Sequence, residues 1–390
     1  MNDLEKRKQV YGICGECNEP GTGFLWCQPC NSKRSVDNFK NWTSGNKDID
    51  KFIQQLQLNA VHCKNYFEWM IPFENFKDIT YITRGGFGKI YSAVWPERYI
   101  EYWDIENQKW KRFGNTKVAL KFWIILFIKS YLQICLWFII KCHGITQEPN
   151  TKDYIMVLEY CNSGNLRNYY LNNGLKYSLK IRDLKGIASG LLDIHNSGKV
   201  HKDFHSVKQK GIYGVLPYMA PEVLRGYQYT KACDIYSFGI MMNEYISEET
   251  PYNKIPHNHA LAIKICKGLR PNTFKYTPKL LADLITKCWD AKAENRPTAK
   301  ELYQKLGQLS DFDDEYDYKI KLNRTSEKRS NNIQTHPQAI YTSRLLNFKN
   351  LPEPVNLGAI QSTLFSEGFD CQLDESDLNE MNQDDQNNIE

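Results

Sequence analysis

The stretch Val118-Ala-Leu-Lys121 is a short aliphatic run that ends in a lysine. It strengthens the interpretation of the glycine-rich segment that precedes it. Upstream, Thr83-Arg-Gly85-Gly86-Phe-Gly88-Lys-Ile-Tyr91 joins two strand-like runs, around 79–82 and 89–94. A glycine-rich hairpin would bring backbone N–H groups against phosphates, and Lys121 would pair with the α- and β-phosphates of a nucleotide. Each feature alone also has a simpler explanation, because glycines are common in hairpins and a lysine at a strand end is usually a solvated charge.

Helical patterns dominate after this strand-rich beginning. Apolar residues recur with helical spacing, and a glycine stands just beyond them as a stop signal: Leu184, Ile187, Ala188, Leu191, Leu192 and then Gly198. Strands followed by helices predict an α+β fold with two lobes, a small β-rich one and a larger helical one.

Four further motifs follow in order: Val157-Leu158-Glu159-Tyr160-Cys161, His201-Lys202-Asp203, Ala220-Pro221-Glu222, and Asp234-Ile-Tyr-Ser-Phe-Gly239. Together with the glycine loop and Lys121, this set resembles the eukaryotic protein kinase family. The sequence His201-Lys-Asp-Phe-His-Ser206 is similar to the catalytic-loop motif of the tyrosine-kinase-like group. The resemblance covers about 76–309 and implies the two-lobed protein kinase fold there.

The resemblance also implies roles for individual residues. Gly85, Gly86, Gly88 and Lys121 would hold the phosphates of ATP, and the backbone of Glu159 and Cys161 would hold its adenine, with Leu158 lining the back of the pocket. Asp203 would be the catalytic base that orients an incoming hydroxyl. Glu222 and Arg296 would form a buried ion pair that braces the larger lobe.

Two catalytic parts of the family are missing from this sequence. Kinase chemistry uses Mg²⁺, which an aspartate and an asparagine hold; the position five residues after Asp203 is Lys208, and 204–219 contain no Asp, Glu or Asn. The lysine of an active kinase also pairs with a glutamate on the next helix, but 122–147 contain no acidic residue. Either the chain is a pseudokinase, or it derives from an active kinase with one segment lost and another mistranslated.

Near the N-terminus, Cys14-Gly-Glu-Cys17 and Cys27-Gln-Pro-Cys30 form two CxxC pairs. Two such knuckles supply the four thiolates that tetrahedral Zn²⁺ prefers. We expect a structural zinc site, because four thiolates leave no coordination position open for catalysis. Four unligated thiols are the alternative.

Composition excludes some classes of protein. A net charge of +5 among 50 basic and 45 acidic residues gives no basic field for nucleic acid. The charged N-terminus lacks the apolar core of a secretory signal, so we expect reduced cysteines and a cytoplasmic location. The apolar run 122–140 approaches membrane-spanning length, but Lys129 interrupts it and a buried core element explains it as well.

The sequence divides into four segments: a zinc segment at 1–34, a linker with a helix at 35–75, the kinase-like domain at 76–309, and a polar, acidic-ended tail at 310–390. The tail composition predicts that this segment is largely disordered. Three functions remain open: an ATP-dependent kinase acting on protein hydroxyls, a pseudokinase that binds signalling proteins, and a membrane-anchored variant.

Overall fold

The computed structural model describes residues 3–68, 71–85, 88–97, 99–112, 114–122, 141–162, 164, 166–173, 176–201, 212–309 and 335–356. The chain forms two compact units. Unit 1 comprises 1–215, 298–327 and 341–346, and unit 2 comprises 216–297, 328–340 and 347–390.

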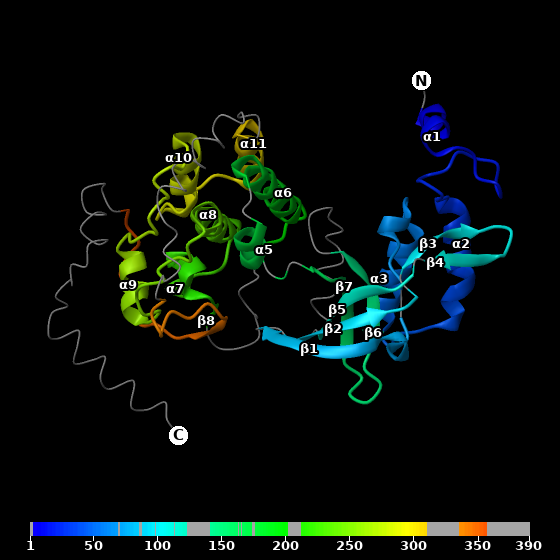
Figure 1. The fold of residues 1–390 in the computed structure, drawn as a ribbon, viewed down its shortest axis with the longest axis horizontal. Helices are drawn as coiled ribbons and strands as arrows, with labels where there is room; N and C mark the ends of the chain where they lie inside the picture. The colour runs from blue at the N-terminus through cyan, green and yellow to red at the C-terminus, as the bar shows by residue number, and fades with distance from the viewer. Residues whose placement is uncertain are drawn as a thin grey trace. The chain divides into compact units, whose positions relative to one another are not determined.

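Unit 1 is built on a five-stranded sheet with the order β1-β2-β5-β7-β6, in which all neighbours are antiparallel (Figure 1). Its strands are β1 (Lys77–Gly85), β2 (Gly88–Trp95), β5 (Thr116–Phe122), β6 (Cys142–Gln147) and β7 (Tyr154–Glu159). Side chains alternate between the two faces. Val118 and Leu120 are buried on one face, whereas Ala119 packs with Met156 and Leu158 on the other.

A helix from the N-terminal part of the chain covers the second face of the sheet. Helix α3 (Lys47–Leu58) begins at Asn46, whose side chain accepts hydrogen bonds from the backbone N–H groups of residues 48 and 49. Ile49 and Ile53 are buried in one cluster with Met156 and Leu158. The helix expected between 35 and 75 is therefore part of the core of unit 1.

The segment before α3 carries the cysteines. It contains α1 (Asp3–Tyr11), α2 (Gln28–Asn38) and the bridges Ile13↔Pro20 and Gly23↔Trp26. Beside it lies a hairpin of β3 (Ile100–Asp104) and β4 (Lys109–Arg112) (Figure 1). The buried Trp26 ring stacks on Trp110 and donates from Nε1 to the carbonyl of Ala60 at 2.7 Å.

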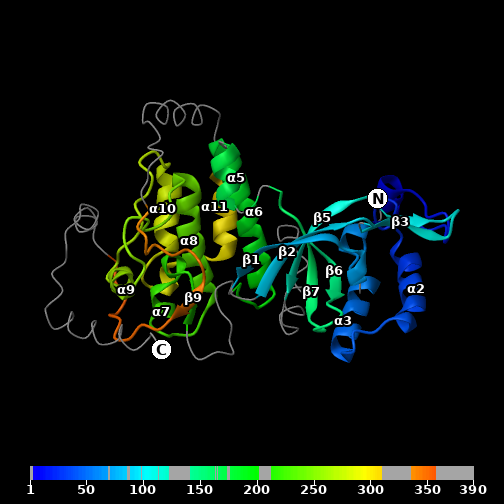
Figure 2. The ribbon, with the colours of Figure 1, turned by 60° about the horizontal axis from the view of Figure 1, so that its bottom comes forward.

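Three helices complete unit 1: α5 (Leu166–Asn173), α6 (Tyr177–Asn196) and α11 (Ala299–Leu309). The predicted helix is confirmed as α6, where Leu184, Ala188 and Leu191 are buried and Gly198 follows with a φ of +73°. Helices α6 and α11 pack side by side (Figure 2).

Unit 2 is helical, with α8 (Lys231–Ser247) at its centre. The other helices are α7 (Pro221–Leu224), α9 (His259–Cys266) and α10 (Lys279–Cys288), and α10 packs on α8. Within the described residues, short 3₁₀ turns lie at Phe39–Asn41, Cys63–Asn65 and Phe73–Asn75 in unit 1, and at Leu216–Tyr218 and Ala293–Asn295 in unit 2. Together, the sheet and the helices confirm the predicted kinase-like α+β class.

The tail departs from expectation where the structure describes it. Residues 335–356 form defined structure, including β9 (Arg344–Leu346), which pairs antiparallel with β8 (Ile212–Gly214). Composition predicted disorder because the segment has few apolar residues. Its order comes instead from backbone hydrogen bonds and a few side-chain anchors, described below.

Within the described residues, no helix is long and apolar enough to cross a membrane. Phe122 belongs to β5, and the rest of the apolar run, 123–140, lies outside the described residues.

Candidate nucleotide and metal sites

Gly88 begins β2, opposite Gly85 at the end of β1. Its φ is +149°, and a Cβ atom there would lie 2.3 Å from the carbonyl oxygen of Phe122. Only glycine accommodates this approach between β2 and the end of β5. Gly86, the middle glycine of the expected phosphate loop, lies outside the described residues.

Lys121 lies near the end of β5, next to Phe122. It is paired with Ile90 on β2 and with Met156 on β7. Strand alternation puts Lys121 on the same face as Ala119, which is the face that α3 covers. Lys121, the expected phosphate-binding residue, is partly exposed. It lies on β5, the strand next to β2, which carries Gly88.

The expected adenine-binding segment forms the end of β7 and the turn after it. Leu158 is buried and paired with Ala119, while Glu159 donates its backbone N–H to the carbonyl of Lys141 at 2.9 Å. Cys161 accepts a hydrogen bond from the N–H of Gly164 at 3.0 Å, which closes the turn. Three neighbouring strands therefore carry Gly88, Lys121 and Glu159.

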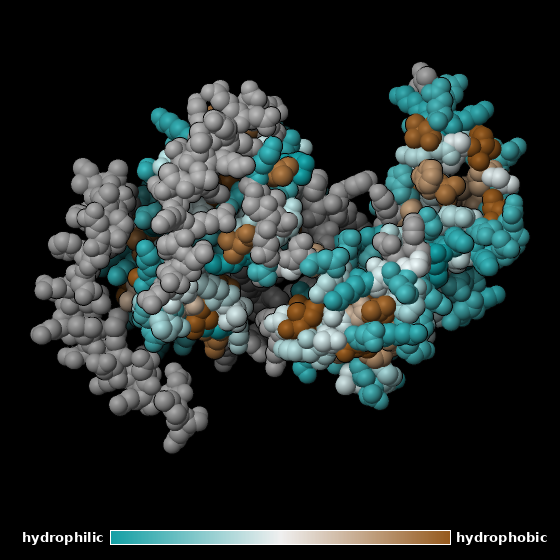
Figure 3. Space-filling view, in the orientation of Figure 1, coloured by the Kyte–Doolittle hydropathy of each residue, from teal (hydrophilic) through white to brown (hydrophobic). Residues whose placement is uncertain are grey.

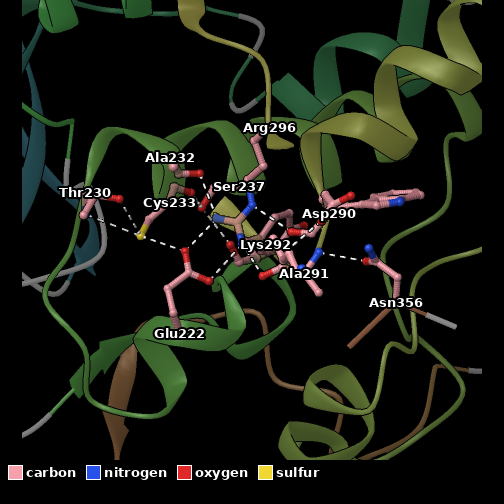
Figure 4. Close-up of polar contacts among 12 residues, drawn as sticks. Glu222, Thr230, Ala232, Cys233, Ser237, Asp290, Ala291, Lys292, Arg296 and Asn356 are labelled. Atoms are coloured by element: carbon pink, nitrogen blue, oxygen red, sulfur yellow. Dashed lines mark hydrogen bonds and ion pairs between the residues drawn. The ribbon is translucent and has the colours of Figure 1, made fainter. Parts of the chain in front are cut away.

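The predicted ion pair between Glu222 and Arg296 is present in unit 2 (Figure 4). Arg296 Nη1 and Nη2 donate to the two carboxylate oxygens at 2.6 and 2.9 Å, and the Arg296 side chain is fully buried. The guanidinium also donates to the carbonyls of Ala232 at 3.0 Å and Asp290 at 2.8 Å. One side chain thus ties together three segments of the unit.

The surroundings of Glu222 set its charge state. Burial disfavours the carboxylate, but the hydrogen bonds and charge of Arg296 outweigh burial, so the pKa of Glu222 lies below its ordinary value. The Cys233 thiol donates to Glu222 Oε1 at 3.2 Å (Figure 4), and burial raises the pKa of Cys233 to about 11. The sequence did not predict that Cys233 or the carbonyls of Ala232 and Asp290 would contact this pair. Backbone acceptors have no sequence signature, and no motif marks Cys233.

The four cysteines of the CxxC pairs converge, with all their sulfur atoms within 4.8 Å of one another. Cys14 Sγ lies 3.9 Å from Cys30 Sγ, and Cys17 Sγ lies 3.6 Å from Cys27 Sγ. Tetrahedral zinc with Zn–S bonds of about 2.3 Å requires S···S separations of about 3.8 Å. Helix α2 starts just after Cys27, which brings the second pair to its first turn. The donor set and its spacing fit zinc.

Comparison with known proteins finds similarity to protein kinases. The family model for protein tyrosine and serine/threonine kinases matches residues 205–306. A probable serine/threonine-protein kinase of Dictyostelium discoideum is 30% identical over 179 residues, which are 44% of this chain and 11% of that protein. Residues 205–306 are therefore similar to eukaryotic protein kinases.

Two further kinases cover more of the chain. Mitogen-activated protein kinase kinase kinase 7 of Drosophila melanogaster is 27% identical over 269 residues, 58% of this chain and 36% of that protein. A serine/threonine-protein kinase of Arabidopsis thaliana is 23% identical over 313 residues, 72% of this chain and 52% of that protein. The chain therefore spans at most about half the length of these curated kinases.

The residues expected to form a catalytic loop remain sequence assignments. Asp203 and Lys208 lie within 202–211, outside the described residues. The positions expected to contact a nucleotide, Gly88, Lys121, Glu159 and Cys161, are among the described residues of unit 1, as is the cysteine cluster.

Proposed function

We propose that this kinase family member binds ATP but is impaired in phosphoryl transfer. One sequence observation carries the proposal: 204–219 contain no Asp, Glu or Asn, the residue types that hold Mg²⁺ in the family. The nucleotide part of the proposal is supported by the positions of Gly88, Lys121 and Leu158 on the neighbouring strands β2, β5 and β7.

Nucleotide binding and phosphoryl transfer depend on different residues, so one can persist when the other is lost. Strand positions and backbone groups supply most contacts to a nucleotide, whereas transfer needs metal ions to neutralise the charge that develops on the moving phosphoryl group. The same chain can therefore hold ATP weakly and still fail to transfer its γ-phosphate.

The alternative role is that of a pseudokinase that binds signalling proteins. The cysteine module favours this role, because Trp26 packs it against Trp110 of the β3–β4 hairpin, whereas the positions expected to contact a nucleotide lie on the five-stranded sheet. Apolar side chains gather on this module (Figure 3). Its exposed apolar residues include Val10, Ile13, Phe24 and Leu25.

Zinc in this module would act structurally. Burial and the neighbouring thiols raise the pKa of Cys27 to about 11 and hold that of Cys30 above its ordinary value. A divalent cation among the four sulfurs would neutralise this crowding of negative charge, and four protein ligands would leave no site for a substrate.

Titration with a fluorescent ATP analogue tests the proposal. We expect saturable binding that Mg²⁺ does not tighten, and a loss of about tenfold or more in affinity for Lys121→Met, because the phosphates lose their cation. The control Lys111→Met, which changes an exposed lysine on β4, should bind like the parent chain. Absence of saturable binding would remove the nucleotide part of the proposal, and Mg²⁺-dependent tightening would remove the impairment.

A further inference from the structure

Residues 347–356 belong to unit 2 and lie on its surface (orange in Figure 1). The structure describes every residue of this segment, and none of them is buried. The Phe348 ring stacks on His259, the first residue of α9, with centroids 5.5 Å apart. Nε2 of His259 lies 3.0 Å from the carbonyl oxygen of Lys349. The segment is therefore attached to the helices of unit 2 without being part of their core.

Arg225, which directly follows α7, binds the one carboxylate of this segment. Its backbone N–H donates to the carbonyl of Pro221 at 3.2 Å, and its guanidinium lies 5.0 Å from the centroid of the Tyr227 ring. The side chain is only 16% exposed. Nη1 and Nη2 donate to the two carboxylate oxygens of Glu353, the first at 2.7 Å. This planar fork matches a carboxylate, so the position favours an acidic residue.

Helix α9 packs on α7 and provides a second contact to the segment. Cys266 is the last residue of α9, and the final carbonyls of a helix have no partner within the helix. The carbonyl of Cys266 accepts the N–H of Val355 at 3.0 Å. Because this hydrogen bond joins two backbones, it fixes the direction of the segment whatever its side chain is.

Asn356 makes the third contact. Its Oδ1 accepts the N–H of Ala291 at 2.8 Å (Figure 4). Burial raises the pKa of the neighbouring Asp290 carboxyl, but a hydrogen bond from the Asn356 side chain and further hydrogen bonds outweigh burial, so this pKa lies below its ordinary value. A carboxamide thus meets a donor with its oxygen and an acceptor with its nitrogen. A carboxylate in the same position would meet the charge of Asp290.

These contacts allow the segment to leave and another to replace it. Glu353 is 75% exposed and Val355 is 49% exposed, and an ion pair with an exposed partner contributes little by itself. Pro352 and Pro354 flank the glutamate and restrict the backbone, which reduces the conformational entropy that an extended peptide loses on binding. A separate peptide with the same pattern can therefore compete for the same contacts.

We propose that this surface of unit 2 is a docking site for extended segments of partner proteins, and that residues 352–356 occupy it as an intramolecular competitor. The partner segment has a glutamate between two prolines and an asparagine three residues later. Arg225 binds the carboxylate, and the carbonyl of Cys266 accepts a backbone N–H. Ala291 and Asp290 bind the carboxamide. All of these groups belong to unit 2, and the site is independent of nucleotide binding.

Anisotropy of a fluorescent synthetic peptide with the sequence of residues 347–356 tests the proposal in the full chain without nucleotide. The parent chain should bind the peptide weakly, because its own segment has a high effective concentration. The double variant Glu353→Ala/Asn356→Ala should release that segment and increase peptide affinity at least fivefold. The matched control Asn347→Ala/Lys349→Ala changes two exposed side chains of the same segment and should bind like the parent chain.

Changes in the peptide test the two side-chain contacts on an unaltered site. With the Glu353→Ala/Asn356→Ala chain, a peptide carrying Asn356→Asp should bind at least fivefold more weakly, whereas a peptide carrying Asn347→Asp should bind as before. Adding Arg225→Glu to this chain should also weaken the original peptide at least fivefold. A peptide carrying Glu353→Arg should restore the affinity, which shows that the Arg225→Glu chain is folded.

Equal peptide binding by the parent chain and Glu353→Ala/Asn356→Ala would overturn the proposal, as would full affinity of the Asn356→Asp peptide. Dimers of the parent chain that form through exchanged 347–356 segments, detected by light scattering, would also overturn it, because the occupant would then be a second copy. A failure of ATP binding would leave these outcomes unaffected.

Discussion

Arg296 illustrates how one residue fixes the helical unit. Its guanidinium is fully buried and bonds Glu222 and two backbone carbonyls (Figure 4). We expect Arg296→Met to lower the free energy of unfolding by about 3–5 kcal/mol, because it removes the cationic partner of Glu222 and the hydrogen bonds to the carbonyls of Ala232 and Asp290. Urea denaturation measures the change.

Two comparisons make this prediction specific. Lys300→Met, which changes an exposed lysine in α11, should alter stability by less than about 0.5 kcal/mol. The double variant Glu222→Gln/Arg296→Met should lose less than the sum of the single losses, since removal of both charges leaves none unpaired. Strict additivity would show that the two residues do not act as a pair.

The Glu222 carboxylate also predicts a dependence on pH. Its pKa is lowered in the folded state by Arg296 despite burial, so the ionised form is favoured on folding. This stabilisation is complete above the unfolded value of about 4.3 and is lost as pH falls through the lower folded pKa. Between about pH 5 and pH 3 the parent chain should lose stability faster than Glu222→Gln. Parallel curves for the two proteins would contradict this sign.

At the scale of elements, the cysteine module should depend on a metal. Protein purified under reducing conditions should contain about one zinc ion per chain by elemental analysis, because the four sulfurs complete a single tetrahedral site. Cys17→Ser should release the ion and change tryptophan fluorescence, since Trp26 directly precedes Cys27. Cys63→Ser, outside the cluster, should retain it. A chain without zinc would leave four free thiols as the correct interpretation.

Helix α3 should stabilise the sheet that carries Lys121. Ile53 is 0% exposed and packs in one cluster with Met156 and Leu158. We expect Ile53→Ala to cost about 2–5 kcal/mol, the range for large-to-small changes in a core. Gln55→Ala on the exposed side of the same helix should cost little. Similar unfolding midpoints for the two variants would mean that α3 does not stabilise unit 1.

The sequence predicted individual helices and strands better than the packing contacts between them. The strand ending at Lys121 and the helix containing Leu184 follow from local patterns, and the structure has both. No local pattern shows that α3 packs on the Lys121 face, because that contact joins residues about a hundred positions apart. The order of residues 335–356 was not predicted for another physical reason: average composition reports the scarcity of apolar residues, but not backbone hydrogen bonds or a single buried residue such as Leu346.

For the candidate site, sequence motifs named Gly88, Lys121 and Glu159, and the strands place them on one sheet. The close approach of Gly88 to Phe122 could not be predicted, since it depends on how β2 and β5 meet. The cysteine spacing predicted convergence correctly because a CxxC turn holds both of its thiols locally. Asp203 lies outside the described residues, so its role remains a prediction.

At the scale of the whole molecule, the proposed function is that of a chain similar to protein kinases that binds ATP and whose sequence has no Asp, Glu or Asn at 204–219. The two missing parts, the ligands after Asp203 and an acidic residue in 122–147, affect different steps of phosphoryl transfer. Their losses should therefore compound, and transfer should be far below that of a complete kinase.

The most direct test compares radiolabel transfer from γ-labelled ATP to a general protein substrate by the parent chain and by Asp203→Asn, with Mg²⁺ or Mn²⁺. The account predicts the same background signal from both proteins, because removal of a general base, usually worth about 10²–10⁴ in rate, changes nothing when charge neutralisation is already missing. Measurable transfer by the parent chain that disappears in Asp203→Asn would contradict it and show that another residue supplies the metal site.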